Sequence, residues 1–231
     1  MRYRLSKGDA FPIAEVLLSR GEKIRIERGA MVYHNCEVEL EGKMNSNSSG
    51  LGGVVKAIGR SAVSGESMFV TTVTGLTDNG TIGIAPGAPG HIKELAIGAE
   101  QWRINDSAFL ACDDSVTYEM KRQKLGKAIF GKTGGLFVME TKGVGTMLVN
   151  TYGDIMEFDL DGSKPFVVDN DHVIAWSASL DYQIKVASGT FGFTSGEGVV
   201  NEFHGRGKIL VQTRNVSSLA RMLAPFIQSG S

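Results

Sequence analysis

One cassette of alternating apolar and polar residues occurs three times, and this repetition limits the folds that the chain can adopt. The copies occupy residues 21–43, 98–121 and 162–185. Because a repeated unit often buries its apolar face against its neighbours, the repetition predicts three similar structural units in tandem. Aligned on Ala30, Ala108 and His172, the copies share these apolar positions: Ile24, Trp102 and Phe166; Ile26, Ile104 and Val168; Val32, Leu110 and Ile174; Val38, Val116 and Leu180.

Each cassette is expected to form a β-hairpin. Residues 23–27 and 37–41 alternate between apolar and charged side chains, which is the period of a half-buried strand. Residues that favour turns follow the first strand of each copy, at 27–29, 105–107 and 169–171. Asp78-Asn79-Gly80 is a further hairpin signal, because Asn-Gly suits the positive dihedral angles of a type I′ turn.

The predicted fold is all-β, with three tandem β-sandwich repeats around a pseudo-threefold axis. The expected repeats are residues 1–90, 91–152 and 153–214, and residues 215–231 form a C-terminal helical tail. In this tail apolar residues recur at helical spacing, Asn215 or Ser217 can cap the helix, and Pro225 should end or kink it. Residues 45–53 have no counterpart in the other copies, and their Gly/Ser composition is typical of a surface loop.

Composition argues against several classes of protein. A formal net charge of −1 argues against a general nucleic-acid-binding protein. No apolar run approaches the roughly 20 residues of a membrane-spanning helix, and the N-terminus lacks the apolar core of a signal peptide. Two cysteines do not make a disulfide framework. We therefore expect a cytoplasmic protein with reduced thiols.

Residues 126–133 (GKAIFGKT) match the phosphate-binding P-loop pattern letter for letter. A P-loop lies between a buried strand and a helix, whereas here a charged run precedes the segment and a glycine-led strand follows it. Residues 127–129 also repeat residues 56–58, so the segment belongs to the repeat. We expect no ATP binding.

No catalytic or metal-binding constellation can be named. The four histidines and two cysteines show no metal-ligand spacing, and no serine lies in the GxSxG setting of a nucleophile elbow. The sequence therefore assigns no catalytic residue, no metal site and no cofactor.

The candidate ligand-binding residues are His34, Cys112 and Trp176, which lie four positions after the three anchors. In an uninterrupted strand they share a face with the apolar positions and point inward, where polar atoms need partners. One interpretation is a pocket where the three copies meet. The other is that each side chain is buried separately in its own unit.

The candidate basic surface consists of Lys43, Lys121 and Lys185, at the one position that is basic in all three copies. With the basic run over residues 121–132, it can contact an anionic partner such as RNA or lipid headgroups. The alternative is a solvated strand edge that lysines protect from pairing.

The tripled cassette, VYHN at residues 32–35, GGLFV at 134–138 and LAP at 223–225 resemble the bacterial relatives of the altered-inheritance-of-mitochondria family. The resemblance covers about residues 11–227. It implies three tandem domains of the fold seen in the tryptophan RNA-binding attenuation protein, whose subunits form a ring that binds tryptophan and RNA. It carries no catalytic residues.

The resulting functional hypothesis is a non-enzymatic binding or assembly (scaffold) protein. The alternatives are a small-ligand or RNA-binding protein, and an enzyme with a site assembled across the repeats. We expect a homo-oligomer, because tandem β units leave open edges unless a ring closes. A protein or membrane-associated partner fits this hypothesis, and no specific nucleic acid is expected.

Overall fold

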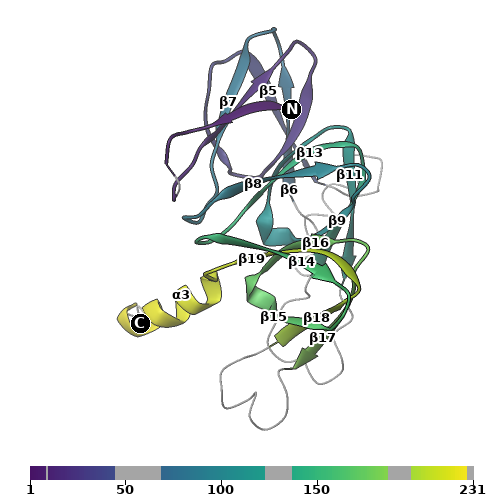
Figure 1. Cartoon of the computed structure of the whole chain (residues 1–231). Coiled ribbons are helices and arrows are strands. Elements are labelled where there is room, and N and C mark those ends of the chain that lie inside the picture. Colours follow the sequence, from purple (N-terminus) through teal and green to yellow (C-terminus); the bar gives the residue numbers. More distant parts are fainter. Residues whose placement is uncertain (9, 45–68, 123–136, 187–198, 228–231) are drawn as a thin grey trace, which may run out of the picture.

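The computed structural model describes residues 1–8, 10–44, 69–122, 137–186 and 199–227. Within them the protein consists of antiparallel strands and a short C-terminal helix (Figure 1). The expected all-β class is confirmed. The predicted surface loop at 45–53 and the P-loop-like segment at 126–133 lie outside the described residues.

The strands in this part of the chain form four sheets. The first has the order β1 (Arg2–Leu5), β2 (Ala14–Leu18), β7 (Gly80–Ile84) and β4 (Met31–His34). The second has the order β5 (Val38–Met44), β6 (Phe69–Gly75), β3 (Lys23–Glu27), β10 (Phe109–Asp113), β13 (Gly145–Asn150) and β8 (Ile92–Ile97). The third has the order β11 (Val116–Arg122), β12 (Phe137–Gly143), β9 (Trp102–Asn105), β16 (Val173–Ser177), β19 (Arg206–Gln212) and β14 (Ile155–Asp161). The fourth has the order β15 (Phe166–Asp169), β18 (Val199–His204) and β17 (Asp181–Val186).

One pairing pattern recurs in three sets of six consecutive strands: β2–β7, β8–β13 and β14–β19. In each set the sixth strand pairs with the first and third, and the fifth pairs with the second and fourth. The second strand of one set also pairs with the third strand of the next, so β3 pairs with β10 and β9 pairs with β16. Each six-stranded sheet therefore joins half of one set to half of the next.

The predicted cassette hairpins are wrong. The strands that flank the first turn, β3 and β4, lie in different sheets and do not pair. The turn is instead a corner between layers, formed in the first copy with Gly29 at φ 86°. In the other copies it contains the 3-10 helices η1 (Asp106–Ala108) and η3 (Asn170–His172). Polar turn residues serve a corner as well as a hairpin, so composition alone did not separate the two.

The turn predicted at Asp78-Asn79-Gly80 is a second correction. It joins β6 to β7, which lie in different sheets, and Gly80 does not adopt a positive φ. A Cβ on Gly80 would lie 3.0 Å from the Glu37 carbonyl oxygen and 3.0 Å from Cγ1 of Val38. Glycine is needed here for a close approach of two chain segments rather than for a type I′ turn.

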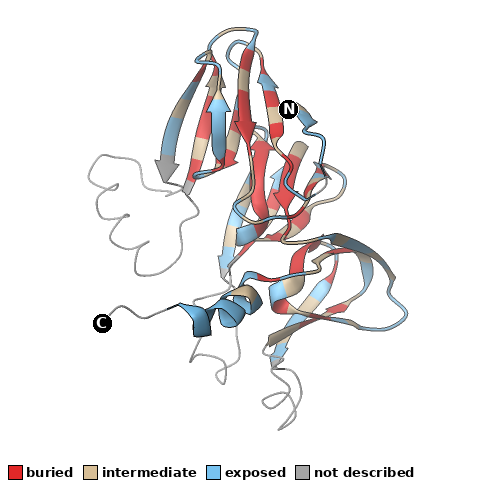
Figure 2. Cartoon of the chain, turned by 90° about the vertical axis from the view of Figure 1, so that its left-hand side faces the viewer, coloured by how far each residue is buried: buried red, intermediate tan, exposed pale blue. Residues whose placement is uncertain are grey.

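The buried residues form three apolar clusters, one between each two consecutive sheets. The first contains Ile24 and Ile26, the second Trp102 and Ile104, and the third Trp176 and Phe203. In Figure 2 the buried residues, in red, lie along the strands, whereas the helix is largely exposed. The four sheets are therefore successive layers that share apolar interiors.

The layers form an open row in Figure 1, from the sheet with β7 at the top to the sheet with β15, β17 and β18 at the bottom. Among the described strands, β4 and β15 have no mutual pairing and belong to the first and last sheets. The expected pseudo-threefold arrangement is therefore not confirmed.

The C-terminal helix α3 (Val216–Leu223) follows the third set and continues into the 3-10 helix η4 (Ala224–Phe226). Asn215 caps it by accepting a hydrogen bond from the Ser218 backbone N–H at 2.7 Å. The helix ends just before Pro225, as predicted. No helix in the described ranges is long and apolar enough to cross a membrane.

Candidate functional site

The third strands of the three sets, β4, β10 and β16, have the same local geometry. Each has a register irregularity against the sixth strand of its set, between residues 31 and 33, 109 and 111, and 173 and 175. The residue inside each irregularity is Val32, Leu110 or Ile174. These three positions are therefore equivalent in backbone as well as in sequence.

Burial separates β4 from its two equivalents. Phe109, Leu110 and Ala111 are completely buried in β10, and Val173, Ile174 and Ala175 are at most 3% exposed in β16. In β4, by contrast, Met31 is 41%, Val32 53% and Tyr33 42% exposed. A strand that is apolar in all three sets is thus open to solvent only in the first.

This difference in burial comes from the strand that pairs with the outer edge of β10 and β16 and that, among the described strands, is missing at β4. β10 is covered along its outer edge by β3, with Ala111 opposite Ile26 and Cys112 opposite Arg25. β16 is covered by β9 in the same register, with Ala175 opposite Ile104 and Trp176 opposite Arg103. β4 belongs to the first set, so no earlier strand of this kind exists in the described chain to cover it.

At the other end of the row of sheets, β15 is a strand equivalent to β3 and β9, but no described strand pairs with its outer edge. In the fourth sheet β15 pairs only with β18. Val167, in its centre, is 54% exposed. Among the described strands there is therefore one open edge of each kind, β4 in the first sheet and β15 in the last.

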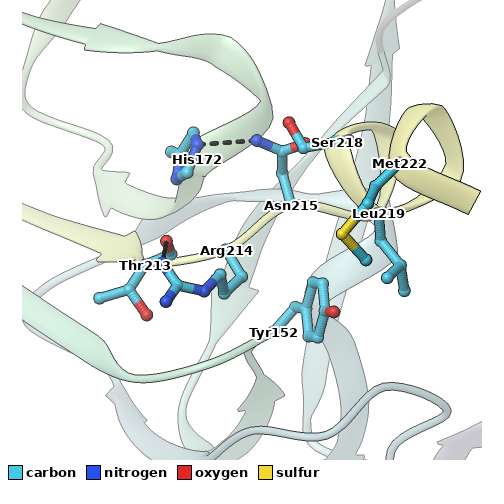
Figure 3. A pocket seen from close by; sticks show the side chains of 8 residues that line it. All are labelled: Tyr152, His172, Thr213, Arg214, Asn215, Ser218, Leu219 and Met222. Atoms are coloured by element: carbon cyan, nitrogen blue, oxygen red, sulfur yellow. Dashed lines mark hydrogen bonds between the residues drawn. The ribbon is translucent and has the colours of Figure 1, made fainter.

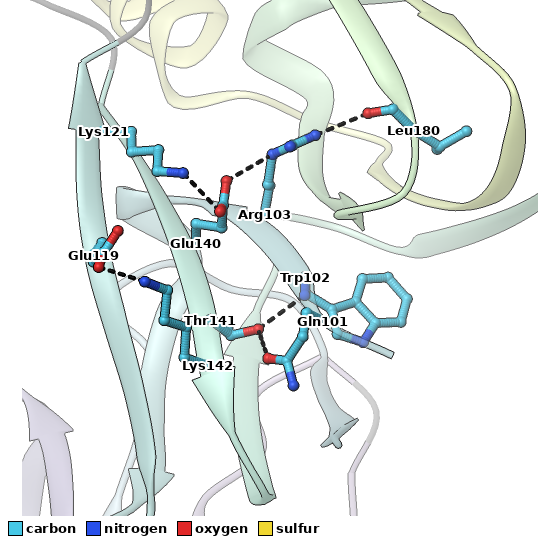
Figure 4. Close-up of polar contacts among 9 residues, drawn as sticks. All are labelled: Gln101, Trp102, Arg103, Glu119, Lys121, Glu140, Thr141, Lys142 and Leu180. Carbon is cyan, nitrogen blue, oxygen red and sulfur yellow. Dashed lines mark hydrogen bonds and ion pairs between the residues drawn. The ribbon is translucent and has the colours of Figure 1, made fainter. Parts of the chain in front are cut away.

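The two internal junctions are strengthened by arginines. Arg25 donates to the backbone oxygen of Asp114 at 2.6 Å, and Arg103 donates to that of Leu180 at 2.8 Å, so each reaches a turn of the following set. Arg103 also pairs with Glu140, which accepts from Lys121 as well (Figure 4). Hydrogen bonds from Lys121 and Arg103 hold the pKa of Glu140 below its usual value.

The open strand β15 lacks such an arginine. The residue of β15 that is equivalent to Arg25 and Arg103 is Val167.

Two of the three candidate basic residues are ion-paired. Lys121 lies 2.6 Å from Glu140, and Lys185 lies 2.7 Å from Glu202. The side chain of Lys43 lies outside the described part, although its backbone pairs with Val70. The positive charges of Lys121 and Lys185 are thus partly neutralised within their own sheets.

The structure does not bring His34, Cys112 and Trp176 together. They occupy the same position of β4, β10 and β16, which lie in three successive sheets. Cys112 is buried in the second apolar cluster, where burial raises its thiol pKa to about 12. Trp176 is buried in the third cluster against Tyr182 and Phe203. His34 is half-buried, and its Nδ1 accepts from the Cys36 backbone N–H. Cys112 and Trp176 are each buried in a separate interior, and no pocket shared by the three exists in the described part of one chain.

A groove of about 340 Å³ lies where α3 leaves the third set (Figure 3). His172 accepts at Nε2 from the Asn215 side-chain amide, and its Nδ1 lies 2.7 Å from the Gln212 carbonyl oxygen. The imidazole thus fixes the residue that caps the helix, which is a structural task. The groove is lined by Tyr152, His172, Thr213, Arg214, Asn215, Ser218, Leu219 and Met222.

Sequence reasoning missed the two open edges as candidate functional residues. The available signal was the apolar run MVYH at Met31–His34, which aligns with FLAC and VIAW in the other sets. A second signal was Val167, at a position where the other two sets have arginine. Both are visible only once the strands are known to pair between sets.

Comparison with known proteins identifies a family. The model described as "Mitochondrial biogenesis AIM24" matches residues 3–214. "Uncharacterized protein M6_Spy0233" of Streptococcus pyogenes serotype M6 is 45% identical over 232 residues, covering 100% of this chain and 93% of that protein. The crystal structure of protein SPYM3_0169 from Streptococcus pyogenes matches with a TM-score of 0.82 and 43% identity, over 98% of this chain and 99% of that one.

Proposed function

This chain belongs to the mitochondrial biogenesis AIM24 family, and we propose that it acts as a non-enzymatic assembly protein that associates with further copies of itself. The observation that carries the proposal is the exposure of Met31, Val32 and Tyr33 in β4, compared with the complete burial of Phe109, Leu110 and Ala111 at the equivalent positions of β10. Burial of a Val-sized side chain is worth about 1.5–3 kcal/mol. Association that covers Met31, Val32 and Tyr33 therefore has a substantial driving force.

The recurring strand pairing supports the finer description of the fold. We propose that the three sets are tandem β-sandwich units of the kind found in the tryptophan RNA-binding attenuation protein, with the boundaries predicted at residues 90 and 152. Each unit has one half in each of two successive sheets, with an apolar cluster between the halves. Such units extend a row by edge pairing, which is the property that an assembly protein needs. The cytoplasmic location of this chain stays a prediction.

The RNA-binding alternative has less support. Recognition of a phosphate backbone relies on positive charges that are free to contact it, whereas Lys121 and Lys185 are paired with Glu140 and Glu202. The lowered pKa values of these two carboxyl groups are accounted for by their basic partners. Two of the three candidate basic residues, Lys121 and Lys185, thus have a structural explanation.

Sedimentation velocity over a wide range of protein concentration tests the proposal. The wild-type protein should associate, and Val32→Asp should be monomeric, because its carboxylate would be buried in an apolar interface without a partner. The matched control is Val144→Asp, since Val144 is 69% exposed at a turn between layers. This variant should associate like the wild type. A wild-type monomer at every concentration would contradict the proposed function.

A further inference from the structure

We propose that the partner of β4 is β15 of a second copy of this chain, with Tyr33 opposite Val168, His34 opposite Val167 and Asn35 opposite Phe166. This inference rests on the proposed self-association and specifies its contact. In this contact the two strands are antiparallel, and the three residue pairs fix their register.

The register follows from two examples inside the chain. At the first junction Ala111, Cys112 and Asp113 lie opposite Ile26, Arg25 and Ile24. At the second, Ala175, Trp176 and Ser177 lie opposite Ile104, Arg103 and Trp102. Both pairings are antiparallel, and they match position for position. The same relation applied to the two open strands gives the three pairs stated above.

Charge on the sheet edges distinguishes β4 and β15 from all other described edge strands. Solvent-exposed edges are commonly protected by charged residues that discourage further pairing. β1, β5, β8, β11, β14 and β17 each carry at least two charged side chains. β4 has no Asp, Glu, Lys or Arg, and β15 has only Asp169 at its end. These two edges lack the protection that the chain gives to every other edge in the described ranges.

The apolar interiors are complementary as well. Leu110 enters the cluster of the preceding set with Ile24 and Ile26, and Ile174 enters the next cluster with Trp102 and Ile104. The third cluster contains Val168 and Phe203, and within the described residues no strand equivalent to β10 or β16 contributes a side chain to it from a later set. Val32 is equivalent to Leu110 and Ile174. In the proposed contact, Val32 of a second copy would enter the third cluster.

The junction between copies would lack a polar contact that both internal junctions have. Val167 replaces the arginine that bridges to the next set in β3 and β9. The contact between chains would therefore depend on apolar burial and backbone pairing. Its strength should accordingly change little with salt, because screening acts on charged pairs.

Site-directed disulfides test the register. In antiparallel strands, directly opposed Cβ atoms lie about 4.5–5.5 Å apart, a distance from which small shifts reach disulfide geometry. Chains with Tyr33→Cys and chains with Val168→Cys are co-expressed, both with Cys36→Ser to remove the exposed thiol. Mild oxidation should give a covalent dimer of the two variants. The control combines Tyr33→Cys with Val167→Cys, which points to the opposite face, and should not cross-link.

Two outcomes would overturn the inference and leave the proposed function standing. One is a dimer of Tyr33→Cys chains alone, which indicates β4 against β4. Another is association by sedimentation without any link between positions 33 and 168. A link within a single chain when both substitutions are placed together would overturn the proposed function as well, because β15 of the same copy would then cover β4. If the wild-type protein is monomeric, the inference and the proposed function fail together.

A measurement on the unmodified protein covers the case in which the cysteine variants do not fold. Paired strand amides exchange slowly with solvent. Peptides that contain residues 31–34 and 166–169 should both gain protection as protein concentration rises. Protection of only one of these segments would overturn the pairing.

Discussion

The ring of Tyr33 lies directly over the backbone of Gly83. A Cβ atom on this glycine would lie 2.3 Å from Cε1 of the ring, closer than any side chain allows. The equivalent pairs in the other sets are Ala111 with Leu148 and Ala175 with Leu210. The large side chain of each pair thus comes from β4 in the first set, and from the sixth strand, as Leu148 or Leu210, in the other two sets.

This exchange of large and small residues predicts the effect of a single methyl group. Gly83→Ala should destabilise the protein by about 1–3 kcal/mol, because overpacking forces the ring or the strand to move. Urea unfolding measures the change. Gly87→Ala is the control, since a Cβ there meets nothing within 4 Å. Equal stability of the two variants would contradict the described contact. In a Tyr33→Ala background, Gly83→Leu should be tolerated, because the pair then matches Ala111 and Leu148.

Glu140 should make stability depend on pH. Its pKa is lowered by Lys121 and Arg103, so its stabilising contribution is complete above its unfolded value near 4.5 and is lost as pH falls through the lower folded value. Glu140→Gln should lower stability by about 1–3 kcal/mol near neutral pH. The difference from wild type should shrink as the pH falls below the unfolded value near 4.5.

Thermal unfolding of both proteins across this pH range measures the difference. Glu119→Gln is the matched control, because Glu119 pairs with Lys142 on the exposed surface and such pairs contribute little. A difference for Glu140→Gln that grows as pH falls would contradict the assignment.

The two thiols should react very differently. Cys36 is exposed, whereas Cys112 is fully buried and its pKa is raised to about 12 by burial. Only a thiolate reacts rapidly with disulfide reagents. In the native protein at neutral pH, one thiol per chain should therefore react with a disulfide reagent, and the second should react only on unfolding. Cys36→Ser should abolish the fast phase; a fast phase that survives this change would place Cys112 near solvent.

The cap of α3 gives a local prediction. Asn215→Ala removes the side-chain oxygen that accepts from Ser218 and the amide that donates to His172, which should weaken the helix by about 1 kcal/mol. Hydrogen exchange should increase in residues 216–223 while the melting temperature of the sheets changes little, because no residue of α3 is buried. Ser217→Ala is the control and should leave exchange unchanged.

Local sequence pattern predicted the strands better than their partners. The alternation in residues 23–27 correctly places Ile24 and Ile26 inside, because the side-chain period of a strand is a local property. Pairing is not local. β3 meets β10, far along the chain, and the polar residues after it form a corner between layers. The hairpin prediction failed because turn chemistry is the same in both structures.

The candidate pocket shows a second limit of the sequence. The repeat correctly predicts that Cys112 and Trp176 point inward, whereas His34, which was expected to do the same, is only half-buried. Repetition in the sequence does not determine whether equivalent positions converge on one pocket or lie in a row. Here they lie in successive sheets. The register irregularity beside Val32, Leu110 and Ile174 was not predictable from alternation, because an extra residue leaves apolar composition unchanged.

The two ends of the row of sheets are unlike, and this gives the molecule a polarity. In the proposed association each contact joins β4 of one copy to β15 of another, so the series of contacts either closes a ring of two or more copies or continues as a filament. In that association a chain blocked at β4 would still offer β15, and a chain blocked at β15 would still offer β4. Small amounts of two differently blocked chains would therefore terminate growth from opposite ends, so the size of the assembly could be controlled by stoichiometry alone.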